Sequence, residues 1–224
     1  MREKSQIDST FINKVPSTQY GVIDMGQKVL IATMYSTEPI MASVTKFGPD
    51  RLILLVDKDA DKNQQASLEL IKKALGGFID IKVIKIELYN IVSIAKKCVE
   101  IIDMQPSGDT IYVNVTSGRK PQAIGLLFAS YARHERVKKI MYIPEEKGKD
   151  FVYLPKLSFK LTESQKKILE ALEGSSYDSI SELAKAVEMS QAMLYRAIDE
   201  LKDLDLISTE DGIVLTDAGK IARL

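Results

Sequence analysis

Short apolar runs and segments with helical periodicity alternate five times along residues 28–155. The apolar runs are continuous, which is typical of strands whose two faces are both buried in a parallel sheet. They cover residues 28–33, 51–56, 79–88, 110–115 and 139–143, and a short edge strand is expected at 151–154. This alternation implies right-handed crossovers and predicts a Rossmann-like, mostly parallel α/β sheet with helices on both faces.

Helical segments separate these runs. Thr37 stands before Glu38 and Pro39, an order typical of a helix that begins with Thr as its N-cap, and Gly48-Pro49 ends that helix. Further helices are expected over residues 63–75, 91–104 and 121–133.

The pattern changes after residue 160. Helical spacing of apolar residues predicts helices over 162–173, 179–187 and 191–204, then a hairpin at 206–208 and 213–215 and a helix from Thr216. This is the order of a winged helix-turn-helix, in which a recognition helix continues into a hairpin wing. The phrase from Leu201 to Ile207 (LKDLDLI) is a recurring feature of that junction.

Four segments follow from these patterns. They are an N-terminal arm at 1–27, a Rossmann-like domain at 28–155, a linker at 156–160 and a winged helix-turn-helix domain at 161–224. The polar composition of the first segment fits a mobile arm, or upstream sequence before a natural start at Met25.

Charge and rare residues narrow the function classes. The net charge is zero, but residues 156–224 carry 9 Lys and Arg against 13 Asp and Glu, so this domain is acidic and has no strong general attraction to nucleic acid. The one cysteine, Cys98, lies in an apolar helical pattern and is expected to be buried. The one histidine, His134, has no second histidine for a metal site, so we expect no metal. No apolar run reaches the ~20 residues of a membrane span, and residues 1–27 lack the centre of a signal peptide. We therefore expect a cytoplasmic protein with no membrane partner.

Two polar loops follow strands in the same style. One runs from Thr33 to Pro39 and the other from Asn114 to Pro121, and each enters a helix with Pro in its first turn. In a doubly wound sheet the first and fourth strands are neighbours, with a crevice between their carboxyl ends. Both helix N-termini would point N–H groups and positive dipole ends into that crevice, which favours phosphate-bearing anions. The candidate ligand-binding residues are Thr33, Tyr35, Ser36, Thr37, Asn114, Thr116, Ser117, Gly118, Arg119 and Lys120. The alternative is that the Thr-Ser-Gly of the second loop only turns a strand into a helix.

Other nucleotide and metal motifs fail. No G-x-G-x-x-G follows the first strand and no G-x-x-x-x-G-K-[ST] occurs, which weighs against a dinucleotide site and a P-loop. The acidic run from Asp57 to Asp61 resembles the start of a calcium loop. The sixth position of such a loop is Gly and the twelfth is Glu, but here these positions are Lys62 and Leu68. We interpret it as a solvated turn.

The second loop resembles a known family. Its Asn114, Thr116, Gly118 and Lys120 match the fourth-strand signature of CRISPR-associated Rossmann-fold (CARF) domains, roughly Asn-x-Thr-Gly-Gly-Thr-Lys-x-Met. Ser117, Arg119 and Gln122 replace the first Gly, the second Thr and the Met of that pattern. A CARF domain followed by a winged helix is the layout of archaeal CRISPR-associated transcriptional regulators. The resemblance implies a homodimer that binds a cyclic oligoadenylate, in particular cyclic tetra-adenylate, as a regulatory ligand and has no other cofactor.

Two function hypotheses follow. In the first, the protein is a transcriptional regulator that binds double-stranded promoter DNA. Its candidate DNA-binding residues are Lys185, Ser190, Gln191, Tyr195, Arg196 and Thr209. Its weak point is the acidic domain, which as an alternative would serve dimerisation or partner binding. In the second, the protein is a metal-independent ring nuclease that degrades the cyclic oligonucleotide, with Ser36 positioning a ribose and Lys120 stabilising phosphate charge.

Overall fold

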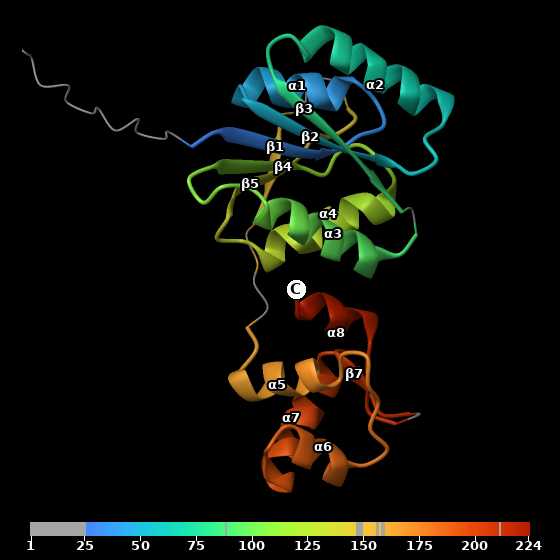
Figure 1. The fold of residues 1–224 in the computed structure, drawn as a ribbon, viewed down its shortest axis with the longest axis vertical. Coiled ribbons are helices and arrows are strands. Elements are labelled where there is room, and N and C mark those ends of the chain that lie inside the picture. Colours follow the sequence, from blue (N-terminus) through green and yellow to red (C-terminus); the bar gives the residue numbers. More distant parts are fainter. Residues whose placement is uncertain (1–25, 88, 147–149, 156, 158–159, 211) are drawn as a thin grey trace, which may run out of the picture.

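The computed structural model describes residues 26–87, 89–146, 150–155, 157, 160–210 and 212–224. The predicted arm lies outside these residues except for Gly26 and Gln27, and only Leu157 and Lys160 of the predicted linker are described. Figure 1 shows a sheet with helices above and below it, joined to a smaller, mostly helical part.

A six-stranded sheet forms the first part of the chain. Its strands are β1 (Lys28–Thr33), β2 (Arg51–Asp57), β3 (Asp80–Ile86), β4 (Thr110–Asn114), β5 (Val137–Tyr142) and β6 (Val152–Leu154). They lie in the order β3-β2-β1-β4-β5-β6, in which every pair is parallel except the antiparallel pair β5–β6. The predicted mostly parallel α/β sheet is therefore confirmed, and the first and fourth strands are neighbours as expected.

Four helices cover the sheet, and Figure 1 shows one pair on each face. They are α1 (Glu38–Phe47), α2 (Lys62–Leu75), α3 (Ile91–Asp103) and α4 (Lys120–Ala132). Side chains of β1 alternate between two cores: Val29 and Ile31 pack in the core with α3 and α4, whereas Leu30 and Ala32 pack in the core with α1 and α2. Burial on both faces explains why the strands are continuous apolar runs.

Two local expectations need correction. The third strand begins and ends inside the predicted range, at Asp80–Ile86. Thr37 precedes α1 but its side chain makes no capping hydrogen bond, because its backbone is already helical (φ −79°, ψ −38°) and a capping residue normally has an extended backbone.

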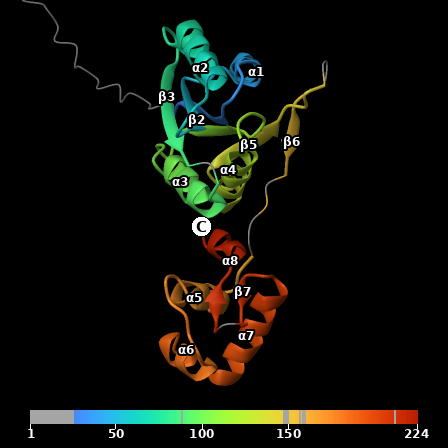
Figure 2. The ribbon, with the colours of Figure 1, turned by 90° about the vertical axis from the view of Figure 1, so that its right-hand side faces the viewer.

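The remaining elements have a separate core (Figure 2). They are α5 (Glu163–Ala171), α6 (Ile180–Ala186), α7 (Gln191–Asp203), β7 (Ile207–Ser208), β8 (Val214–Leu215) and α8 (Asp217–Ala222). Side chains of Thr162, Ser179, Ser190 and Thr216 cap the four helices, since each accepts a hydrogen bond from the first turn. Strands β7 and β8 pair antiparallel, so the predicted hairpin is present in the predicted place. Among the described residues, no helix is both long and apolar enough to cross a membrane.

Candidate functional site

The two polar loops meet at the carboxyl ends of β1 and β4. These strands pair in register up to Ala32 and Asn114, so the loop that leads into α1 lies beside the loop that leads into α4. Each helix begins within a few residues of its strand, and the first N–H groups of a helix lack intrahelical partners. At the carboxyl ends of β1 and β4, two neighbouring loops therefore lead into two helix N-termini.

Hydrogen bonds lock the loops together. The Thr33 hydroxyl donates to the Ser117 carbonyl, and the Ser117 hydroxyl accepts from the backbone N–H groups of Tyr35 (2.9 Å) and Ser36 (3.1 Å). Thr33 and Ser117 are buried, so these two candidate ligand residues support the loops from inside the protein and are not exposed to solvent.

Gly118 permits this close approach. Its φ is +86°, a left-handed conformation that side chains other than Gly rarely adopt, and a Cβ here would lie 3.0 Å from the Thr33 Cβ and 3.1 Å from the Gln122 Oε1. Position 118 therefore requires glycine for its backbone conformation and for the close approach of the two loops.

Asn114 and Thr116 also act inside the protein. The Asn114 amide donates to the Ser43 hydroxyl (2.6 Å) and its Oδ1 accepts from the Thr116 N–H (2.8 Å). The Thr116 hydroxyl accepts from the backbone N–H of Ile143, which follows β5 (2.8 Å). These side chains tie the second loop to α1 and to the end of β5.

The acidic turn after β2 is only partly the solvated turn that we expected, because Lys58 and Asp59 are exposed but Asp57 is not. Asp57 is buried, and its carboxylate accepts from the Gln122 amide (2.8 Å) and from the Arg119 Nε (3.3 Å). Arg119 also lies 3.6 Å from the Asp61 carboxylate, and its Cζ is 5.5 Å from the centre of the Tyr35 ring. A buried carboxylate requires a counter-charge, so Arg119 is anchored by Asp57. The calcium-like spacing concealed this role, which depends on a residue 62 positions away.

The charges of this cluster shift one another. The hydrogen bond to Asp61 raises the pKa of Tyr35, and the backbone N–H of Gln64 followed by the Tyr35 hydroxyl lowers the pKa of Asp61. The hydrogen bond to Asp57 raises the pKa of Arg119. The cluster sets two acidic side chains against one guanidinium, so Arg119 adds less net positive charge to the site than its sequence position suggested.

The exposed part of the site is smaller than the predicted set. Ser36 and Thr37 are half-buried at the start of α1, Arg119 is half-exposed, and Lys120 is exposed at the first position of α4. Within the described residues, the Lys120 ammonium has no hydrogen bond or ion pair. An exposed cation at the N-terminus of a helix suits a phosphate group.

The candidate DNA-binding residues are distributed over α6, α7 and the connection between β7 and β8. Ser190 caps α7 by accepting from the Met193 N–H, and Gln191, Tyr195 and Arg196 lie exposed along that helix. Lys185 on α6 and Thr209 between β7 and β8 are exposed as well. Arg196 donates to Glu200 one turn later (3.2 Å), and this carboxylate partly offsets the positive charge that Arg196 presents to solvent. Met193 on the same helix is exposed as well.

In the described parts of the chain, no group of three or more His, Cys, Asp or Glu residues is placed to hold a metal ion. Cys98 is buried as predicted, and burial raises its thiol pKa to about 12, which disfavours the reactive thiolate.

Several solved structures of other proteins are similar to this chain. Can2 from Sulfobacillus thermosulfidooxidans in complex with cyclic tetra-adenylate is 15% identical with a TM-score of 0.47, over 87% of this chain and 63% of that one. Enterococcus italicus Csm6 bound to cyclic hexa-2'-fluoro-hexa-dAMP is 18% identical with a TM-score of 0.46, over 81% and 55%. Protein VC1899 from Vibrio cholerae is 11% identical with a TM-score of 0.44, over 88% and 64%. The matched region spans less than two thirds of each of those three chains.

A comparison with curated proteins gave no match. A family model described as "HFX_2341_N:-like, N-terminal" matches residues 29–147, more than half of the chain and nearly all of the α/β domain. The chain therefore belongs to the HFX_2341_N-like, N-terminal family.

Proposed function

We propose that residues 28–155 sense a cyclic oligoadenylate, cyclic tetra-adenylate in the first instance, and that residues 161–224 form a winged helix-turn-helix that binds promoter DNA. One observation carries the ligand part. The CARF-like residues Asn114, Thr116, Gly118 and Lys120 lie on a loop that is locked to the loop after β1, and the unpaired Lys120 stands at the N-terminus of α4. Phosphate diesters suit that combination of a free cation and a helix N-terminus.

The proposal includes a homodimer. A cyclic oligoadenylate repeats one unit around a ring, so a two-fold pair of identical sites matches its symmetry, and regulators of this kind read two half-sites. Light scattering tests this, and a monomer at micromolar concentration both with and without the ligand contradicts it.

Calorimetry with cyclic tetra-adenylate tests the ligand. Lys120→Ala removes one charged hydrogen-bond donor and should weaken binding by at least ~1.5 kcal/mol per site, about tenfold. Lys73→Ala is the matched control, because Lys73 is an exposed lysine near the end of α2 and away from the two loops. Equal affinity of the wild type and Lys120→Ala refutes the site, and no binding by the wild type refutes the function.

The ring nuclease is the second candidate, because Ser36 and Lys120 stand on the two facing loops. Incubation of the protein with cyclic tetra-adenylate and chromatography of the products distinguishes the two functions. Linear products that disappear in Lys120→Ala indicate cleavage, and an intact ring indicates a sensor.

Two variants on α7, with opposite expected effects, test DNA binding. Arg196→Ala removes an exposed cation and should lower affinity for the promoter and reduce the salt slope by about one unit. Glu200→Gln removes the carboxylate that pairs with Arg196 and keeps an amide oxygen to accept from Gln165, so it should raise affinity. A gel-shift series at two salt concentrations measures both, and identical binding of the three proteins leaves the C-terminal domain better explained as a protein-interaction module.

A further inference from the structure

The two domains touch through a narrow contact between α3 and α8. These helices form the main contact between the α/β domain and the C-terminal domain in the described part of the chain, and both views of the ribbon show α8 next to α3 (Figures 1 and 2). Leu224 packs against the core of the α/β domain, and Arg133 donates to its carbonyl.

One carboxylate, that of Glu173, pairs with a cation on each of the two helices. Glu173, which follows α5, accepts from Lys96 on α3 at 3.2 Å through Oε1. Its Oε2 pairs with Arg223 at the end of α8. The ion pairs with Arg223 and then Lys96 lower the pKa of Glu173 to about 2. Glu173 thus joins α8 and the α5 turn to a lysine of the other domain.

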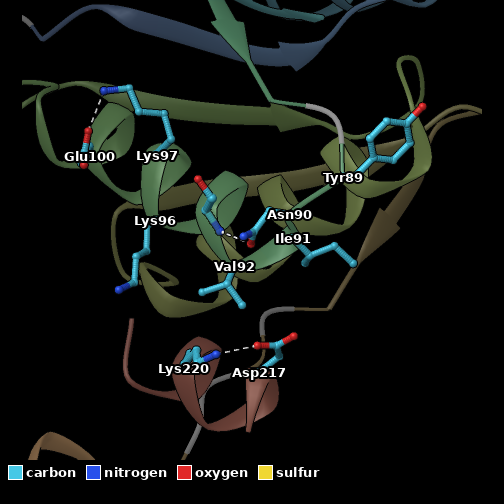
Figure 3. Close-up of a pocket in the computed structure, with 10 residues that line it drawn as sticks. Tyr89, Asn90, Ile91, Val92, Lys96, Lys97, Glu100, Asp217 and Lys220 are labelled. Atoms are coloured by element: carbon cyan, nitrogen blue, oxygen red, sulfur yellow. Dashed lines mark hydrogen bonds and ion pairs between the residues drawn. The ribbon is translucent and has the colours of Figure 1, made fainter. Parts of the chain in front are cut away.

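Open space flanks the contact. A pocket of about 760 Å³ lies between α3 and α8, and Figure 3 shows Lys96 extending from α3 towards the C-terminal domain beside it. Lys97 and Lys220 also line that pocket, but each pairs within its own helix, with Glu100 and with Asp217. A second pocket of about 300 Å³ surrounds Arg133 and Arg223. Because water and salt reach half-exposed pairs, a contact of this kind is easily opened.

The same helix α3 is packed tightly on the helix that starts in the proposed site. Lys120 is the first residue of α4. One turn and a half later, a Cβ on Gly125 would lie 2.4 Å from Ile94 Cγ2 and 3.2 Å from the Ala95 nitrogen of α3. Backbones this close move together, so a displacement at the start of α4 reaches α3 and its Lys96.

We propose that the α3–α8 contact is a dissociable dock, closed by the Lys96–Glu173–Arg223 bridge, through which the state of the loop site sets the position of the C-terminal domain. The dock itself follows from the bridge and the flanking pockets. Its control by a cyclic oligoadenylate rests on the proposed function. In this scheme the contact is either closed or open, and both the loop site and the C-terminal domain can shift the equilibrium between these two states.

Distance measurement between spin labels on the full chain tests the dock. Labels on Lys73→Cys in α2 and Asp199→Cys in α7 report the domain separation, because both positions are exposed and buried Cys98 stays unlabelled. We expect a narrow distance distribution in the otherwise native protein. Lys96→Ala should broaden it, and so should 0.5 M salt, whereas Lys97→Ala should leave it narrow because Lys97 pairs within α3.

Glu173→Gln is the second variant, with Glu170→Gln on the preceding turn as its control. Circular dichroism verifies that each variant stays folded. A distribution that is the same in the native protein, Lys96→Ala and Glu173→Gln overturns the dock. Addition of cyclic tetra-adenylate should shift the native distribution. If calorimetry shows binding but the distribution stays fixed, control by the ligand is refuted, and if calorimetry shows no binding, the proposed function fails while the variants still decide the dock.

Discussion

Gly118→Ala should unfold the α/β domain more easily and disturb the candidate site. The φ of +86° costs a residue with a Cβ about 1–2 kcal/mol. The new Cβ would stand 3.0 Å from the Thr33 Cβ and 3.1 Å from the Gln122 Oε1, and such crowding in a packed region typically costs about 1–3 kcal/mol. Loss of glycine entropy from the unfolded chain returns about 0.4–1 kcal/mol. We therefore expect a net loss of about 1–4.5 kcal/mol in the free energy of unfolding.

Urea unfolding followed by circular dichroism measures this loss. Gly77→Ala is the matched control, because a Cβ there has no neighbour within 4 Å and its backbone does not need glycine. The control should keep or slightly raise stability. The hydrogen bond between Thr33 and Ser117 holds the two loops together, and the added Cβ would push them apart. Gly118→Ala should therefore also lower the affinity of the site for its ligand.

Equal midpoints for Gly118→Ala and the native protein would refute the reasoning. It would mean that the loop after β4 relaxes without cost, and that its hydrogen bonds to the loop after β1 do not define the site. A loss of stability in Gly77→Ala of similar size would show that glycine replacement, and not the geometry at Gly118, is responsible.

Three further outcomes are expected. Asp57→Asn should lower the free energy of unfolding by about 1–3 kcal/mol, because it removes a charged hydrogen bond between the buried Asp57 and Arg119, whereas Asp59→Asn, at an exposed position two residues later, should change it by less than about 0.5 kcal/mol in urea melts. The thiol of Cys98, with its pKa raised to about 12, should resist a thiol reagent at pH 8 in the folded protein and react in urea; rapid modification without urea contradicts its burial. The pKa of Glu173 is lowered from 4.5 to about 2, so its ionised form contributes stability that is complete above pH 4.5 and is lost as the pH falls towards 2. The difference in unfolding free energy between the native protein and Glu173→Gln should therefore shrink across that interval, and a constant difference would argue against the bridge.

Local pattern was enough for the element types and the sheet. The central positions of β1 (residues 29–32) and β2 (residues 52–56) are all apolar, because both faces of a central parallel strand are buried, so the pattern itself indicates the architecture. The neighbouring position of β1 and β4 also followed, since short right-handed crossovers leave few arrangements.

The sequence predicted that the two candidate loops follow neighbouring strands, but not which of their side chains would be buried and which exposed. Sequence reasoning gave ten residues one role, whereas the structure buries Thr33, Asn114 and Ser117 as supports and leaves Lys120 exposed. Side-chain type and position alone do not say whether a polar group faces the solvent or another loop.

The sequence by itself determined which segments become strands and helices, because periodicity and capping residues act over a few neighbours. Only the tertiary structure decided that Arg119 pairs with Asp57, 62 positions earlier, and that Glu173 bridges Lys96 and Arg223 across two domains. Charge pairing depends on distance in space, and residues far apart along the chain acquire that distance only when β2, α4 and α8 have packed.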